Sequence, residues 1–219
     1  MRAEDGWQQA IARALETVAR PIPADPRFLP RRAVSNPEQD ADDARRFDRS
    51  QFPPPRAAAT LLLIYPSDRE LVIPLTVRHE DLRRHAGEIS LPGGAVDDTD
   101  TSLEDAALRE AEEEIGLDRS AVRVIGRLDP IWIPVSNYEL VPVVAVADTR
   151  PRLIPGAAEV AELVEFPLRL LMDDDGVAEE EIHVPGVLLR AGVYRWAGHR
   201  VWGATARTLS MLGTALAVD

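Results

Sequence analysis

The chain predicts an α/β fold in which a mixed β-sheet lies between helices. Strand-like runs occur on both sides of a single helical segment in the middle of the chain, and a second helical segment follows the last strand. The 219 residues, 45% of them hydrophobic, suffice for one good-sized core. We therefore expect one domain with additional segments rather than two full domains.

The N-terminal quarter of the chain divides into a helical segment and a proline-rich one. Residues 5–20 predict a short amphipathic helix that Asp5 can cap. The apolar residues at helical spacing are Trp7, Ile11, Ala14, Leu15 and Val18. Because so short a helix is marginal in water, we expect it to dock on the compact part of its own chain or of a homodimer partner. Residues 21–55 hold eight of the 18 prolines and predict an extended arm, which leaves residues 56–219 as the compact domain.

Strands dominate the predicted compact domain. The runs 57–65 and 70–77 flank the turn residues Pro66–Arg69 and predict a hairpin. A glycine-rich turn follows at Leu91–Gly94, and a helix is expected at 102–115. The later expected elements are strands at 122–134, 139–147 and 160–166, short pieces near 181–190 and 193–202, and a closing helix at 204–217.

The central helix has recognisable boundaries and a buried face. Thr101 is expected as its N-cap, with Glu104 three residues later completing a capping box, and Gly116 ends it. The apolar positions that can bury the helix against a sheet are Leu108, Ala111 and Ile115. Arg109 precedes Glu113 by four residues and can hold that carboxylate in one rotamer.

The opposite face of this helix predicts a metal site. Glu110, Glu113 and Glu114 stand at i, i+3 and i+4, so three carboxylates project together and repel one another. A divalent cation relieves that repulsion, and ligands that are all oxygen suit Mg²⁺ or Mn²⁺. Gly93 and Gly94 permit a close backbone approach to a ligand, and a carbonyl there, such as that of Gly94, completes the predicted coordination. A glutamate-rich helix alone is more often a solvated face, but the flanking arginine and glycines favour the metal site.

Composition excludes several classes of function. The formal charge of −12 disfavours a general nucleic-acid binder, because phosphate backbones require a basic surface. The absence of cysteine rules out disulfides and thiolate chemistry. No apolar run reaches the roughly 20 residues that span a bilayer, and the first residues do not resemble a signal peptide, so we expect a cytoplasmic protein.

The stretch from Gly94 to Leu117 resembles the Nudix box, G-x5-E-x7-R-E-U-x-E-E-x-G-U, where U is a bulky aliphatic residue. Its second half matches as Arg109-Glu110-Ala111-Glu112-Glu113-Glu114-Ile115-Gly116-Leu117, with Ala111 smaller than the usual aliphatic residue. Its first half departs from the box, because Gly94 lies one residue farther from Arg109 and the first glutamate falls on Asp100 or Thr101. The resemblance implies a Nudix α/β/α sandwich and supports the metal cluster.

A second stretch, Leu75 to Gly94, is similar to the signature of the coenzyme A pyrophosphatases within that family, L-L-T-x-R-S-x3-R-x3-G-x3-F-P-G-G. Arg78, Arg83 and Gly87 fall in register, whereas His79 replaces the usual serine and Leu91 the usual phenylalanine. Guanidinium groups bind phosphate as planar forks, which suits the diphosphate and the 3'-phosphate of coenzyme A. The alternative is a pair of surface arginines that form weak ion pairs with Glu80 or Asp81.

These resemblances imply hydrolysis of coenzyme A to 3',5'-ADP and 4'-phosphopantetheine, with Glu110, Glu113 and Glu114 as metal ligands. The proton acceptor is one of them, or Glu159 or Glu162 near the late strand, and the sequence does not decide which. Two alternatives remain: a hydrolase of another nucleoside diphosphate derivative (ADP-ribose, NADH or a dinucleoside polyphosphate), and a Nudix binding module without turnover. The intact glutamate set argues against the binding module.

Overall fold

The structure, a computed structural model, describes residues 6–34, 36, 38–39, 45, 47–79, 87–173, 176–184 and 186–217. The described helices are α1 (Trp7–Thr17), α3 (Leu103–Ile115) and α4 (Gly203–Leu216). The described strands are β1 (Arg31–Arg32), β2 (Arg56–Ser67), β3 (Glu70–Arg78), β4 (Ile89–Ser90), β5 (Gly93–Ala95), β6 (Arg123–Arg127), β7 (Ile131–Ile133), β8 (Tyr138–Val146), β9 (Val160–Pro167), β10 (Val177–Val184), β11 (Val187–Trp196) and β12 (His199–Val201). No described helix is long and apolar enough to cross a membrane.

The larger sheet is mixed, as the sequence predicts. Its strands follow the order β4-β3-β2-β8-β6, while β5, β7 and β9 pair with β2, β8 and β3 respectively. The long strands β2 and β8 run parallel, and the other pairs are antiparallel. The predicted hairpin is present, but its turn is only Asp68–Arg69, both with positive φ, because Pro66 and Ser67 still pair with β3.

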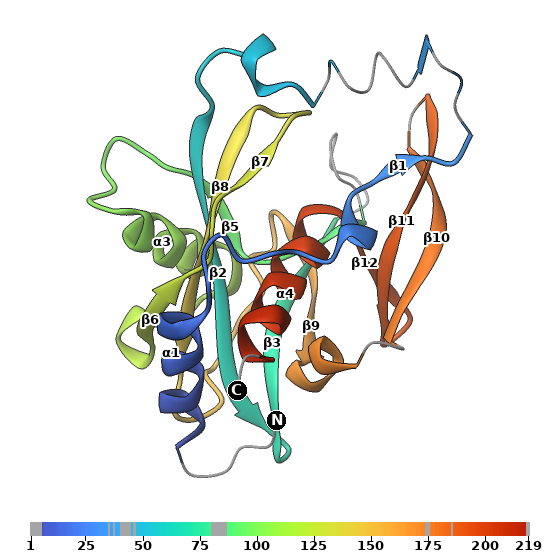
Figure 1. Cartoon of the computed structure of the whole chain (residues 1–219). Coiled ribbons are helices and arrows are strands. Elements are labelled where there is room, and N and C mark those ends of the chain that lie inside the picture. Colours follow the sequence, from blue (N-terminus) through green and yellow to red (C-terminus); the bar gives the residue numbers. More distant parts are fainter. Residues whose placement is uncertain are drawn as a thin grey trace.

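Helices cover both faces of this sheet (Figure 1). Side chains along β2 alternate between the two faces, as a strand buried on both sides requires. Leu61, Leu63 and Tyr65 pack with the apolar side of α3, whereas Leu62 and Ile64 belong to the cluster that also contains residues of α1 and α4. The α/β sandwich predicted from the sequence is therefore confirmed.

The N-terminal helix docks on its own chain. Trp7, Ile11 and Leu15 are buried in the main core, where α1 contacts α4 and β6. The helix begins after Gly6 without a side-chain cap, and Asp5, the expected cap, lies outside the described residues. The described part of the arm is not simply extended. It forms short 3-10 turns at Pro26–Phe28 and Arg49–Gln51 and the strand β1, and it buries Ile22 and Phe28 in the same core.

The last strands form a smaller sheet with the order β1-β11-β10, and β12 also pairs with β11 (Figure 1). The sequence interpretation of two short pieces, 181–190 and 193–202, is wrong here, since β11 runs without a break through Gly192. Gly192 does not end the strand. A Cβ atom there would lie 3.1 Å from Arg27 and Phe28, so glycine allows the arm to pack closely against β11.

Candidate active site

The helix α3 begins one residue later than predicted. Ser102, and not Thr101, is its N-cap, and the Ser102 hydroxyl accepts a hydrogen bond of 3.1 Å from the Asp105 amide. The Asp105 carboxylate in turn accepts a hydrogen bond of 3.0 Å from the Thr101 amide. Glu104 is not available for the expected capping box, because its carboxylate pairs with Arg127 on β6. A reciprocal pair of capping hydrogen bonds is therefore present, but Ser102 and Asp105 contribute the side chains in place of Thr101 and Glu104.

The predicted glutamates lie together in one cleft. Glu110, Glu113 and Glu114 line a cavity of about 230 Å³, closed on the other side by residues 156–159. Their environments differ: the side chain of Glu114 is 9% exposed and that of Glu113 is 59% exposed. Glu159 lies at the rim of the same cleft, contributed by the loop before β9. Four carboxylates therefore face a single small volume.

Burial and the charges nearby make two of the cleft carboxylates, those of Glu110 and Glu114, costly to ionise. The pKa of Glu114 is raised to about 7, mainly by removal from water and also by the neighbouring charge of Glu110, while a 3.2 Å hydrogen bond from the Gly93 amide works in the opposite direction. The pKa of Glu110 is also raised, mainly by burial, although Arg109 lowers it. A positive charge in the cleft would relieve both effects, so the site favours a cation.

Arg109 organises the base of the cleft through several contacts. Its Nε and Nη2 atoms bind the two oxygens of Asp100 at 2.9 and 3.0 Å, and its Nη1 binds Glu110 at 2.9 Å. Glu113, the partner expected from helical spacing, is more distant at 3.5 Å. Arg109 also donates to the carbonyl of Ala95. Of the two residues that align with the first glutamate of the box, Asp100 fixes the arginine that holds Glu110, whereas Thr101 donates to Asp105.

The glycines at 93 and 94 belong to the strand β5 rather than to the predicted turn. They pair with Thr60 and Ala59 of β2. A Cβ atom on Gly93 would lie 2.5 Å from the Ala59 carbonyl oxygen, and one on Gly94 would lie 2.5 Å from the Glu110 carboxylate. Glycine is required at Gly93, where the neighbour is backbone, and at Gly94 it allows the Glu110 carboxylate to lie where it does. The backbone of these glycines is therefore closely approached, as expected, and the groups that approach it are the β2 backbone and the Glu110 side chain.

Arg78, the first arginine of the predicted substrate-binding motif, lies at the same cleft. It ends β3, and its Nη1 and Nη2 atoms lie 3.9 Å from Glu114 and 3.4 Å from Glu159. Gly87, with a φ of 68°, donates its amide to the Arg78 carbonyl. Arg83 lies outside the described residues.

Glu162 takes a different position from the other predicted glutamates. It lies within β9, its side chain is 57% exposed, and its carboxylate is 3.5 Å from Nε2 of His199. It does not line the cleft. From the sequence, Glu159 and Glu162 are equivalent candidates. The alternation of side chains along a strand cannot separate them, because Glu159 lies in the loop before β9 and Glu162 lies within it.

The donor set fits a divalent cation. In the part of the chain that the structure describes, no three acidic or histidine side chains converge closely enough to form a ready-made metal centre. Glu110 and Glu114 are instead engaged by Arg109 and by the Gly93 amide. The candidate side-chain ligands are nonetheless all carboxylates, which hard cations prefer, and the side chain of Glu113 is 59% exposed.

Comparisons with known proteins identify the family of this chain. The Nudix domain model matches residues 54–185, and the chain belongs to the Nudix family. It is an enzyme, a Nudix hydrolase that cleaves diphosphate bonds in nucleoside diphosphate derivatives, and Nudix hydrolases generally use divalent metal ions.

Its relatives include proteins called "Uncharacterized Nudix hydrolase NudL". The one from Escherichia coli O7:K1 is 40% identical over 147 residues, which cover 66% of this chain and 74% of that protein. The one from Shigella boydii serotype 18 is 38% identical over 144 residues, with the same shares of the two chains.

Similar solved structures include a Nudix hydrolase from M. smegmatis, RenU. It is 25% identical, with a TM-score of 0.45, and the match covers 54% of this chain and 74% of that one. The NUDIX domain of Shewanella oneidensis NrtR, complexed with ADP ribose, is 21% identical with a TM-score of 0.43, covering 59% and 84%.

Proposed function

We propose that this enzyme hydrolyses the diphosphate bond of coenzyme A or a coenzyme A derivative, releasing 3',5'-ADP and 4'-phosphopantetheine. The observation that carries the proposal is the position of Arg78. Arg78, the first arginine of the coenzyme A signature, reaches Glu114 and Glu159 in the glutamate cleft, which supports a shared site for the signature and the cleft. Arg83, Gly87, Gly93 and Gly94 complete the proposed substrate-binding set.

Glu110, Glu113 and Glu114 would hold Mg²⁺, with Mn²⁺ as the alternative, and the carbonyl of Gly94 would add a further ligand. Such a cation lowers the pKa of a water molecule and neutralises charge on the diphosphate oxygens. The acidic cleft binds an anionic diphosphate only when cations offset its charge, because like charges repel at this separation. Metal binding and substrate binding should therefore be coupled.

Among the candidate proton acceptors we favour Glu159. It lies in the cleft, 3.4 Å from Arg78, and is half exposed, so it can reach a water molecule at the reacting phosphorus. Glu162, paired with His199 outside the cleft, is the weaker candidate.

Arg78 and Arg83 should serve different parts of the substrate. The guanidinium of Arg78 lies between two cleft carboxylates, where the diphosphate would bind, and a planar fork matches two phosphate oxygens. We assign it to the diphosphate. Arg83 is then the candidate for the 3'-phosphate, five positions farther along the signature.

The test is Mg²⁺-dependent hydrolysis of coenzyme A, 3'-dephospho-coenzyme A, ADP-ribose, NADH and diadenosine polyphosphates, with products identified by mass. We expect the highest kcat/KM on coenzyme A. Arg78→Gln should reduce kcat/KM on coenzyme A and on its 3'-dephospho form alike, whereas Arg83→Gln should affect coenzyme A alone. Faster turnover of ADP-ribose or a dinucleotide would replace the proposed substrate, and a loss confined to coenzyme A in Arg78→Gln would move that arginine to the 3' end.

A further inference from the structure

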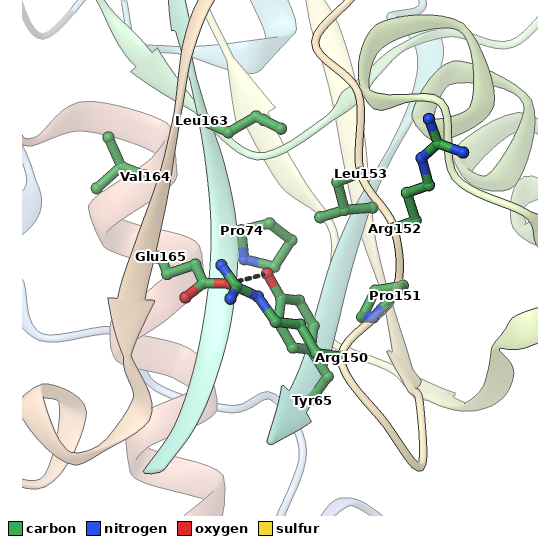
Figure 2. A pocket seen from close by; sticks show the side chains of 9 residues that line it. All are labelled: Tyr65, Pro74, Arg150, Pro151, Arg152, Leu153, Leu163, Val164 and Glu165. Carbon is green, nitrogen blue, oxygen red and sulfur yellow. Dashed lines mark hydrogen bonds and ion pairs between the residues drawn. The ribbon is translucent and has the colours of Figure 1, made fainter. Parts of the chain in front are cut away.

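A second cavity, of about 360 Å³, lies between the sheet and the loop that precedes β9. Its floor consists of side chains from β2, β3 and β9, and residues 150–153 form its opposite wall (Figure 2). None of the four cleft glutamates lines it. The residues assigned above to diphosphate hydrolysis are therefore not among those that line it.

The polar side of this cavity is built around Glu165. The carboxylate accepts hydrogen bonds from the Tyr65 hydroxyl at 2.9 Å and from the Ser67 hydroxyl at 2.8 Å, and it pairs with Nε of Arg150 at 2.9 Å. Figure 2 shows the Arg150 guanidinium beside Tyr65 and Glu165, while Arg152 points away from them. Both carboxylate oxygens of Glu165 therefore already have partners within the protein.

Arg150 retains donors for a ligand. Its side chain is 63% exposed, the ion pair runs through Nε, and among the described residues its terminal nitrogens donate no hydrogen bond. Because Glu165 engages Nε, the terminal edge of the guanidinium can present a planar fork to a phosphate or carboxylate. Next to this fork the walls are apolar, formed by Pro74, Pro151, Leu153 and Leu163. Together these features suit an anion attached to a flat apolar group.

The loop between the two cavities is fixed to the end of α3. The Ile154 amide donates to the Ile115 carbonyl at 2.8 Å, and the Gly156 amide donates to the Glu114 carbonyl at 2.7 Å. A Cβ atom on Gly156 would lie 2.8 Å from the Glu113 carbonyl oxygen, so loop and helix are in close contact there. Residues 150–153 line the second cavity and residues 156–159 line the cleft. The attached segment separates the two volumes.

We propose that this cavity is a second binding site, specific for a small anion that carries a flat apolar group, with Arg150 binding the anion and Leu153 and Leu163 contacting the flat group. The site is independent of the glutamate cleft and does not rest on the choice of substrate.

The test is binding of phenyl phosphate to the full chain, with a chelator present so that the acidic cleft repels anions. Calorimetry or ligand-observed NMR should show saturable binding at least tenfold tighter than that of inorganic phosphate. Arg150→Gln and the cavity-filling Leu153→Trp should each weaken binding tenfold or more. Arg123→Gln, which neutralises an exposed arginine on β6 outside the cavity, should not, and melting temperatures verify that all three variants fold.

Absence of saturable binding in the wild-type chain would overturn the proposal. So would equal affinity in the wild type and Arg150→Gln, or loss of binding in Glu114→Gln with retention in Arg150→Gln, since that pattern would place the ligand in the cleft. If Leu153→Trp fails to fold, the Arg150→Gln comparison and the preference over inorganic phosphate still decide the matter.

Discussion

Glu114 combines burial with a negative charge in the centre of the candidate site. Its carboxylate is almost fully buried where α3 meets β5, and its charge is opposed by Glu110 and supported by the Gly93 amide and Arg78. In water such a group would be fully ionised at neutral pH. Here its pKa is about 7, because in the metal-free protein the Gly93 amide and Arg78 do not fully offset the cost of burying its charge.

This position predicts a pH-dependent stability. Because the pKa of Glu114 is raised above its unfolded value, the folded state is favoured while Glu114 is protonated, and that advantage is lost as the pH rises toward 7. In chelator, the unfolding free energy of the wild type should fall relative to Glu114→Gln by roughly 2–3 kcal/mol between about pH 5 and pH 8. Urea unfolding of both proteins across this range measures the difference. A constant difference would show that Glu114 is not the perturbed acid.

Residue-level prediction from the sequence worked where contacts are local. Helical spacing alone placed Glu110, Glu113 and Glu114 on one face. It misjudged Arg109, whose main partner Asp100 precedes the helix, because spacing within a helix says nothing about a loop that folds back. The meeting of Arg78 with Glu159 depends on the pairing of β3 with β9, which only the tertiary fold provides.

At the scale of elements, β5 lies between the sheet and α3, and it contacts both β2 and α3. Its two glycines face different neighbours: Gly93 lies against the backbone of β2, and Gly94 lies against the Glu110 side chain. Backbone cannot move aside easily, whereas the end of a glutamate side chain can turn. The two positions should therefore respond differently to the same substitution.

We expect Gly93→Ala to destabilise the fold by about 2 kcal/mol or more, because a methyl group there overlaps the β2 backbone. Gly94→Ala should leave the melting temperature nearly unchanged but reduce kcat/KM roughly tenfold or more, because it displaces a proposed metal ligand. Thermal unfolding and metal-dependent turnover of the two variants provide the comparison. Full activity in Gly94→Ala would show that Glu110 need not occupy its described position.

Long periodic elements were predictable, and short ones were not. Apolar runs bounded by turn residues located β2, β3, β8, β9 and both later helices. The strand β5 has only three residues and two glycines, so it reads as a turn. The sequence pattern split β11 into two pieces because Gly192 interrupts its apolar run. The reason for that glycine, the arm packed against the strand, is visible only in the structure.

At the scale of the whole molecule, the N-terminal helix extends the core of the Nudix fold. Ile11 is completely buried and lies in the same cluster as residues of β2 and α4. The sequence predicted that the apolar stripe would dock, and the structure confirms docking within the chain. The division of the chain at residue 56 and a homodimer remain predictions.

Ile11→Ala should lower the unfolding free energy by roughly 2–4 kcal/mol, since it removes buried methyl groups and leaves a cavity. For a chain of this size the melting temperature should fall by roughly 5–15 °C. Gln9→Ala, on the exposed side of α1, is the matched control and should change little. Neither should alter kcat at a temperature where both are folded. An unchanged melting temperature in Ile11→Ala would mean that the helix does not pack as described.

The central claim is that the buried glutamate cleft on α3 performs metal-dependent diphosphate hydrolysis. Its most direct test is kcat/KM at saturating Mg²⁺ for the wild type, Glu114→Gln and Glu112→Gln, on the best substrate of the panel above. Glu112 is the matched control, because it lies on the same helix but pairs with Arg119 away from the cleft. We predict a loss of roughly a hundredfold or more for Glu114→Gln, with normal folding, and turnover within about twofold of wild type for Glu112→Gln. Equal activity in the two variants would contradict the account.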